Sequence, residues 1–286
     1  MKPMITLLAP LVGAGLALAA AGCGGSTNVQ VPTVAPAAVY QLVHLVPSVP
    51  VQAGRPVRVA FTIQQPDGQP LTRFKTGPGP HTGVHLIFVR DDLAYIIHEH
   101  PPVGQATIAK TVVFPAPGPY RMVVDVYPAA SDQQINANFQ LFGSVRVAGA
   151  YRPRPLPPPA SATTVDGYHF TLHGANDLKA ISPALVTVDV TGPGGSKPTF
   201  TPWYGALAHA IFFRQRSLDY FHTHVCAPGV SGCTSVLGPV KVTGTSSTPG
   251  KLNVGVLVPA PGTWRLFLQC EIDGKVLTVP FTLEVH

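Results

Sequence analysis

The chain has little charge and too few of the residues that build helical bundles. Only 11% of its 286 residues are charged, against roughly 25% in an average soluble domain. A soluble helical bundle needs far more Glu, Lys, Ala and Leu, so this composition excludes that class. Hydrophobic residues make up 45% of the chain, too many for disorder, and 28 glycines and 32 prolines accompany them. The composition predicts an extracytoplasmic β protein with many Gly and Pro turns, and the length favours two domains.

Concentrated positive charge is also missing, although Lys and Arg outnumber Asp and Glu by 19 to 13. Residues 38–148 hold eight basic against six acidic side chains, and residues 163–286 hold eight against seven. A nucleic-acid-binding protein gathers its basic residues on one face, so we expect no nucleic-acid partner. The sequence also lacks the Gly-x-Ser-x-Gly, His-Glu-x-x-His and phosphate-binding motifs of common enzymes. We therefore expect no enzymatic activity.

The amino-terminal segment consists of apolar residues that follow Lys2 and end in Ala-Ala-Gly-Cys23. This arrangement resembles a bacterial lipoprotein signal, whose cysteine becomes lipidated. An ordinary secretory signal and an uncleaved anchor helix are the alternatives. The resemblance implies a signal peptide over residues 1–22, a palmitate-type lipid on Cys23 and a flexible tether over residues 23–38. It also implies attachment to the extracytoplasmic face of the cell membrane.

The chain has four cysteines, and three remain for disulfide chemistry once Cys23 is assigned to the lipid. Cys226 and Cys233 flank a short segment, which favours a bridge that closes a small loop. Cys270 would then be buried and free in an apolar strand. The spacing leaves open the alternative that Cys270 pairs with one of the other two.

The chain contains an internal repeat, in which the pattern His-x12-His-x-His occurs twice with an Arg five residues after each first histidine. Its members are His85, His98 and His100, and then His209, His222 and His224. A Pro-Ala-Pro-Gly turn follows each pattern and leads into an apolar strand. The repeat predicts a first domain over residues 39–148, a Pro-rich linker over residues 149–162 and a second domain over residues 163–286. These domains are called the first copy and the second copy below.

Each copy is predicted to consist of short strands separated by turn signals. Residues 85–90 and 95–100 form a hairpin, and residues 207–213 and 219–224 form its equivalent in the second copy. About seven short strands per copy are typical of an immunoglobulin-like β-sandwich, and a cupredoxin-like sandwich fits the pattern as well. The predicted fold is all-β, with two tandem sandwiches.

The hairpins are expected to gather histidines on one face. Residues i and i+2 of a strand share a face, so His98 and His100 point the same way. An even loop places His85 opposite His100, and the same register places His209 opposite His224. Three imidazoles then form a metal site on each hairpin, with Cu(II) as the favoured ion and Zn(II) as the second candidate.

The first copy is the stronger candidate for this metal site, because it keeps the full pattern from His85 to His100 with an Asp pair in the turn. His81 and Glu99 are additional candidate ligands. The remaining histidines are interpreted as incidental, namely His44, His169, His173 and His286.

A structural role for the histidines is the alternative to metal binding. Each His-x-His would then end a strand, with its ring nitrogens bonded to nearby backbone groups. Arg90 and Arg214 would likewise be structural partners of Asp125 or Glu271. On this alternative the protein is a non-catalytic module that docks a protein partner or a component of the cell envelope.

The repeated hairpin motif, with Tyr95 before His98-Glu-His100-Pro and Gly-Ala before His209, resembles a group of secreted bacterial proteins built from YtkA-like or CopC-like sandwich domains. The resemblance covers both copies through their hairpins and their Pro-Ala-Pro-Gly turns. It implies an extracytoplasmic protein that binds or handles copper or another heavy metal.

Overall fold

The computed structural model describes residues 39–129, 138–228, 244–246 and 248–286. The predicted signal peptide, Cys23 with its tether, and Cys233 lie outside the described residues. Within the described part of the chain, no helix has the length and apolar character needed to cross a membrane.

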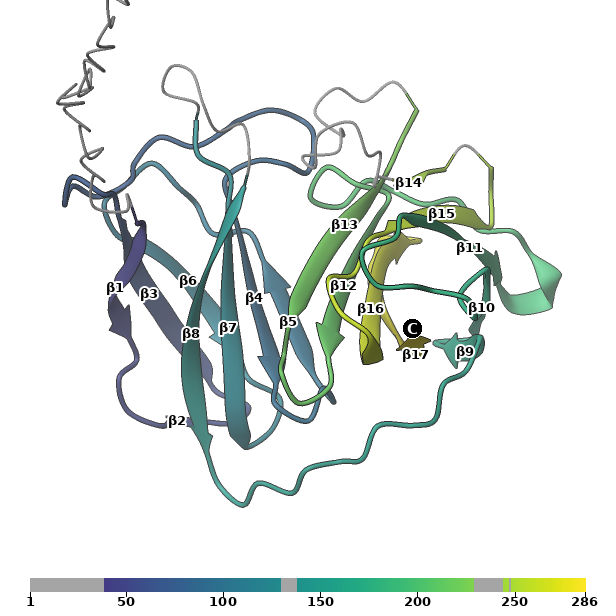
Figure 1. Ribbon diagram of the computed structural model, residues 1–286, viewed down its shortest axis with the longest axis horizontal. Helices are drawn as coiled ribbons and strands as arrows, with labels where there is room; N and C mark the ends of the chain where they lie inside the picture. The colour runs from purple at the N-terminus through teal and green to yellow at the C-terminus, as the bar shows by residue number, and fades with distance from the viewer. Residues whose placement is uncertain (1–38, 130–137, 229–243, 247) are drawn as a thin grey trace, which may run out of the picture. The chain divides into compact units, whose positions relative to one another are not determined.

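The first copy is a sandwich of two sheets in which most neighbouring strands are antiparallel (Figure 1). One sheet has the order β1-β3-β6, formed by Gln41–Val46, Pro56–Gln64 and Ile108–Val113. The other has the order β2-β8-β7-β4-β5, formed by Val51–Gln52, Phe139–Ala148, Gly118–Val126, Val84–Arg90 and Ile96–Glu99. Alternating apolar side chains of both sheets, such as Phe61, Leu86 and Phe88, fill the space between them.

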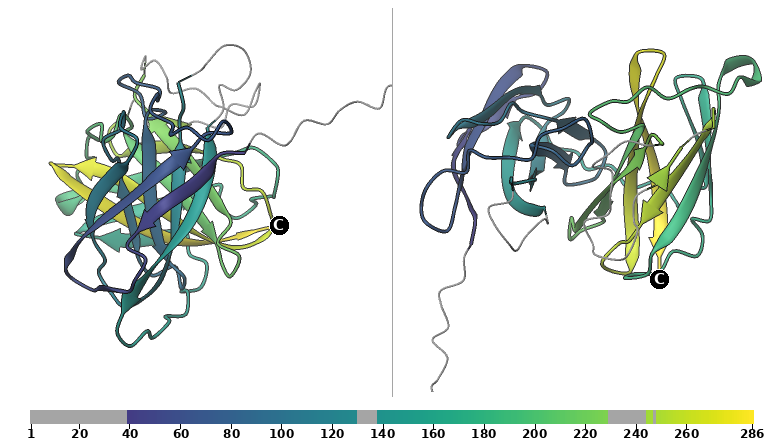
Figure 2. Two further views of the ribbon diagram at one scale, coloured as in Figure 1. Left: turned by 90° about the vertical axis from the view of Figure 1, so that its left-hand side faces the viewer. Right: turned by 90° about the horizontal axis from the view of Figure 1, so that it is seen from above.

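The second copy repeats this architecture, and Figure 2 shows its two layers edge-on. The four-stranded sheet has the order β15-β11-β10-β9, formed by Lys251–Val256, Ala184–Thr191, Tyr168–His173 and Ala162–Val165. The five-stranded sheet has the order β14-β13-β12-β16-β17, formed by Gly244–Thr245, Tyr220–Cys226, Ala208–Arg214, Gly262–Ile272 and Lys275–Val285. Among the described residues of this copy, the remaining element is a 3-10 turn, Pro193–Gly195.

The fold is therefore all-β, with two tandem immunoglobulin-like sandwiches, and the fold class predicted from the sequence is confirmed. Four strands were not anticipated: the edge strands β1, β2, β9 and β14. They are short or only partly buried, so their hydrophobic pattern is weak.

Strand β4 is buried along its whole length, on both of its faces. One face, with Leu86 and Phe88, packs inside the first sandwich. The other face, with Ile87 and Val89, packs in a third apolar cluster with residues of the second copy, including Ile211 and Phe213. A strand covered on both faces is expected to be a continuous apolar run, as β4 and its equivalent β12 are. The five-stranded sheets of the two copies therefore contact each other through the hairpins that carry the histidines.

Candidate metal centre

The strand registers place the histidines as the sequence predicted. In the first hairpin Ile87 pairs with His98 and Leu86 with Glu99, so His98 and His100 share the face of His85. In the second hairpin His209 pairs with His224, and Ile211 pairs with His222. The predicted even-loop register is confirmed in both copies.

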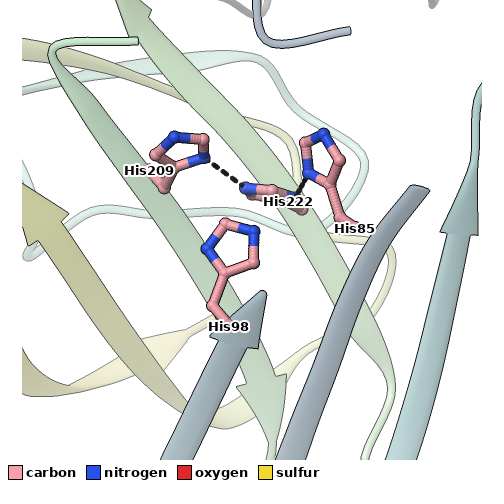
Figure 3. A group of neighbouring side chains, drawn as sticks. All are labelled: His85, His98, His209 and His222. Atoms are coloured by element: carbon pink, nitrogen blue, oxygen red, sulfur yellow. Dashed lines mark hydrogen bonds between the residues drawn. The ribbon is translucent and has the colours of Figure 1, made fainter. Parts of the chain in front are cut away.

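This shared face is the outer face of each five-stranded sheet, and it brings the two histidine sets together. Four of them, His85, His98, His209 and His222, offer ligand nitrogens that all lie within 4.8 Å of one another (Figure 3). The first two come from β4 and β5 and the last two from β12 and β13, at equivalent positions of the repeat. The fold thus forms one centre from both copies.

The sequence led us to expect a separate site on each hairpin, and the structure differs in this respect. The period of a strand fixes which face a side chain occupies but not what that face meets. Here each face meets its repeat, because the apolar residues below the histidines pack together in the third cluster.

The third histidine of each hairpin lies at the margin of the four. The Nε2 atom of His100 is 3.3 Å from Nε2 of His98, and its ring stacks on Tyr204 with centroids 3.9 Å apart. Nδ1 of His224 is 3.0 Å from Nε2 of His81. All six predicted histidines and the secondary candidate His81 therefore belong to one cluster.

Hydrogen bonds to the surrounding protein fix the tautomers of three of the four central histidines. Nε2 of His85 donates to the carbonyl of Pro80 over 2.7 Å, and Nε2 of His209 donates to the carbonyl of Trp203 over 2.9 Å. Because a carbonyl can only accept, the proton of each ring is on Nε2 and Nδ1 keeps its lone pair. Bonds of this kind orient the histidine ligands of metal sites.

The third tautomer is set by Gln269. Its Nε2 donates to the hydroxyl of Thr278, and its Oε1 accepts from Nδ1 of His98 over 3.0 Å. Nε2 of His98 is therefore a third acceptor nitrogen.

These acceptor nitrogens outnumber the donors around them. Nδ1 of His85 and Nδ1 of His209 lie 3.3 Å from opposite nitrogens of His222, but a neutral His222 carries one proton and can donate to only one of them. Four ligands at 2.0–2.1 Å from a tetrahedral ion would have nitrogens separated by about 3.3–3.4 Å. Each contact to His222 has this spacing, but the two contacts use opposite nitrogens of its ring, and one ligand atom from each of the four histidines gives separations of no more than 4.8 Å. Among the described residues, three acceptor nitrogens face two donors, so a cation within the group would satisfy the lone pair left over.

The cluster is held in its neutral form. Burial, together with the charge of neighbouring histidines, lowers the pKa of His209 to about 3 and that of His100 to about 2. Burial also lowers the pKa of His85 and His98 well below the usual value. Burial lowers the pKa of His222 as well, although Asp125 partly opposes this shift. Metal binding requires neutral imidazoles, and these residues are neutral at pH 7.

Other predicted residues lie elsewhere. Glu99 pairs with Lys110 over 2.9 Å and is not among the four grouped residues. Arg90 pairs with Asp92 and Arg214 with Asp219, so the suggested partnerships with Asp125 and Glu271 are not formed.

Two of the histidines that were interpreted as incidental have contacts outside the histidine cluster. His173 forms an exposed pair with Asp189, and His169 bonds Thr164. Neither is among the four grouped residues.

The cysteines of the described segments have different states. Cys226 is disulfide-bonded, whereas Cys270 is free and buried, and burial raises the pKa of its thiol to about 12. The alternative that gave Cys270 a disulfide partner is therefore excluded.

The sequence interpretation missed the groups that surround the histidines: Asp125, Gln269, Trp203 and Tyr204. A signal for two of them was present. Asp125 and Gln269 each follow the glycine of the Pro-Ala-Pro-Gly turn by seven residues, so extending the repeat along the next strand would have found both.

Fold and cluster together define a tandem β-sandwich protein with a buried polyhistidine centre. The chain belongs to the family described as Domain of unknown function (DUF8832), whose sequence profile matches residues 41–148 and 163–286. No curated protein matches the chain.

Several solved structures are similar to the chain at low identity. The Lin-41 filamin domain is 11% identical, with a TM-score of 0.27, covering 45% of this chain and 96% of that one. The Escherichia coli adhesin FdeC is 14% identical, with a TM-score of 0.23, covering 87% and 64%. A chimeric titin Z1Z2 is 12% identical, with a TM-score of 0.23, covering 87% and 97%.

Proposed function

We propose that this protein binds one transition-metal ion between its two copies through His85, His98, His209 and His222. The observation that carries the proposal is the excess of acceptor nitrogens among the described residues: three point into the cluster, and the two rings placed to donate to them are His222 and His100. Cu(II) is the first candidate and Zn(II) the second, since imidazole suits both and Cu(II) ranks higher in the general affinity order.

The surroundings of the centre favour holding the ion over catalysis. All four side chains are at least 95% buried, and four protein ligands would close a tetrahedral shell. Closed shells are typical of structural and storage sites, whereas catalytic sites keep a position open. A bound ion would also join the copies, because each supplies two ligands.

We also propose that the protein is a lipoprotein, anchored through Cys23 to the extracytoplasmic face of the cell membrane. The apolar leader that ends in Ala-Ala-Gly-Cys23 supports this location. The disulfide at Cys226 agrees with an oxidising compartment. The resemblance of the hairpins to YtkA-like and CopC-like domains supports a role in handling copper.

Titration of Cu(II) into the purified full-length protein tests the metal site. His98→Ala and His209→Ala lie in different copies, and each should abolish tight binding because each removes a ligand of the same ion. His173→Ala, far from the cluster, serves as the control and should bind like the wild type. Unchanged affinity in both ligand variants would overturn the proposal and leave the histidines as structural groups.

The anchor is tested by labelling cells with a fatty-acid probe. Cys23→Ser should accumulate as unprocessed precursor without label, because the acceptor thiol is gone. Labelling equal to that of the wild type would contradict the anchor.

A further inference from the structure

The two copies place different residues at one equivalent position beside the centre. Asp125 lies opposite His85 in the pairing of β4 with β7, and Gln269 lies opposite His209 in the pairing of β12 with β16. Directly opposed residues share a face, so both side chains lie on the faces that carry the histidines.

Each of these side chains reaches the middle histidine of the other copy. Gln269 of the second copy accepts the Nδ1 proton of His98 over 3.0 Å. In the reciprocal contact, Oδ2 of Asp125 faces Nδ1 of His222 at 3.7 Å. The arrangement is symmetric in position and asymmetric in charge, since one group is a carboxylate and the other an amide.

Asp125 is buried to an unusual degree for an acidic residue. Its side chain is 1% exposed. The side chain of Asp92 is similarly buried at 3%, but Asp92 is paired with Arg90. Asn138 and Gln140 donate to its Oδ1 over 2.7 and 3.0 Å, and the hydroxyl of Tyr220 donates to its Oδ2 over 3.1 Å. These bonds fix the carboxylate with Oδ2 toward the histidine cluster.

The ion-pair partner that the described residues give Asp125 is His222, not a lysine or arginine. Burying a carboxylate without a permanent cation costs free energy, so a positive charge near Asp125 would stabilise the folded protein. Four neutral imidazoles add no charge of their own, and a bound cation would supply it.

We infer that Asp125 makes the centre selective for divalent over monovalent ions, an inference that rests on the proposed metal-binding function. The interaction energy of two charges scales with their product, so a carboxylate stabilises a divalent ion about twice as strongly as a monovalent ion at the same distance. The probe pair is Cu(II) and Cu(I), which differ by this one charge. The equivalent position of the second copy holds the neutral Gln269. Of these two positions, therefore, only that of Asp125 provides a negative charge to balance the charge of the ion.

The test compares charge variants that keep the shape of the side chains. Asp125→Asn removes the carboxylate, Gln269→Glu adds one at the equivalent position, and the double variant moves the charge from one copy to the other. Competition with chelators gives the dissociation constants of Cu(II) and Cu(I) for each protein, and electrochemistry gives the copper reduction potential.

Asp125→Asn should still bind one ion but shift the ratio of Cu(II) to Cu(I) affinity about tenfold or more toward Cu(I) and raise the potential. Gln269→Glu should shift both in the opposite direction, and the double variant should return both toward the wild type. Circular dichroism checks that each variant is folded.

The outcomes separate the two proposals. A wild-type protein that takes up neither copper ion nor Zn(II) overturns the proposed function and this inference together. A protein that binds one copper ion, with the same affinity ratio and potential in Asp125→Asn as in the wild type, overturns the inference and leaves the metal site intact. A potential that moves in Asp125→Asn but is not restored in the double variant overturns the equivalence of the two positions.

Discussion

The first and second copies contribute the same three histidines from equivalent positions of equivalent hairpins, yet the groups around those histidines differ. His222 faces the carboxylate of Asp125, whereas its equivalent His98 bonds the amide of Gln269. His224 contacts His81, whereas its equivalent His100 stacks on Tyr204.

In both cases the histidine of the second copy has an ionisable neighbour, Asp125 or His81, which the first copy supplies. The equivalent histidine of the first copy has Gln269 or Tyr204 as its neighbour, which the second copy supplies. The comparison teaches that the metal ligands follow the repeat and that the neighbours break its symmetry. A pair of identical copies would form a centre with two equal halves, whereas this centre has one half with a charged neighbour.

The largest expected effect is on the free energy of unfolding, and it should come from substitutions in the third apolar cluster, which contains residues of both copies. Phe213 and Val89 occupy equivalent positions in the two copies, and both are fully buried. Phe213→Ala should lower the free energy of unfolding by about 3–5 kcal/mol, and Val89→Ala by roughly 1–2 kcal/mol, because fewer carbon atoms are removed from the cluster. Chemical denaturation measures both, and changes within about 0.5 kcal/mol in both variants, as for surface positions, would contradict burial of these side chains in the shared cluster.

The next effect is on pH dependence. The pKa of His209 is lowered to about 3 by burial, so in the unfolded chain this group binds a proton at higher pH than in the folded protein. Stability of the metal-free protein should therefore be full above pH 6.5 and fall as the pH drops from about 6.5 toward 3. His209→Gln should reduce this slope in thermal unfolding measured across pH, and the exposed His169→Gln should not. A slope unchanged in His209→Gln would contradict burial of a neutral His209.

A smaller effect distinguishes the copies through their cysteines. The first copy has no cysteine, and the second has the disulfide-bonded Cys226, which we predict to be paired with Cys233. Reduction should destabilise the second copy by about 2–3 kcal/mol, the value for a short closed loop. Hydrogen exchange should show the loss of protection in the second copy alone. A peptide that links Cys226 to a cysteine other than Cys233 would refute the pairing.

The smallest effect should come from making the copies more alike at the margin of the cluster. His81→Tyr places at residue 81 the side chain that Tyr204 provides in the second copy. Since His81 is not one of the four grouped residues, Cu(II) affinity should change by less than about threefold, a difference below 1 kcal/mol. A loss of tight binding would identify His81 as a ligand.

Local pattern in the sequence was sufficient to predict the central strands and the hairpin registers, but not the edge strands β1, β2, β9 and β14. Alternation and an even loop determine that His98 and His100 share a face with His85, and the structure has this arrangement. The meeting of the two hairpins was not predicted, because strand periodicity carries no information about which surface covers a face. The apolar runs of β4 and β12 held a clue, since Ile87 and Ile211 would be exposed in an isolated sandwich.

Asp125 illustrates the same limit. From the sequence it was a candidate structural partner of an arginine, Arg90 or Arg214. Its contact with His222 spans 97 positions of the chain and crosses between the copies, so only the packing of the two sheets reveals it.

The most direct measurement of the central claim is the number of metal ions bound per chain, determined by native mass spectrometry of the full-length protein with saturating Cu(II). A centre shared by the two copies predicts one tightly bound ion, which is lost in His98→Ala and equally in His209→Ala. Two ions per chain, with one remaining after either substitution, would contradict the shared centre and show that each hairpin binds its own metal.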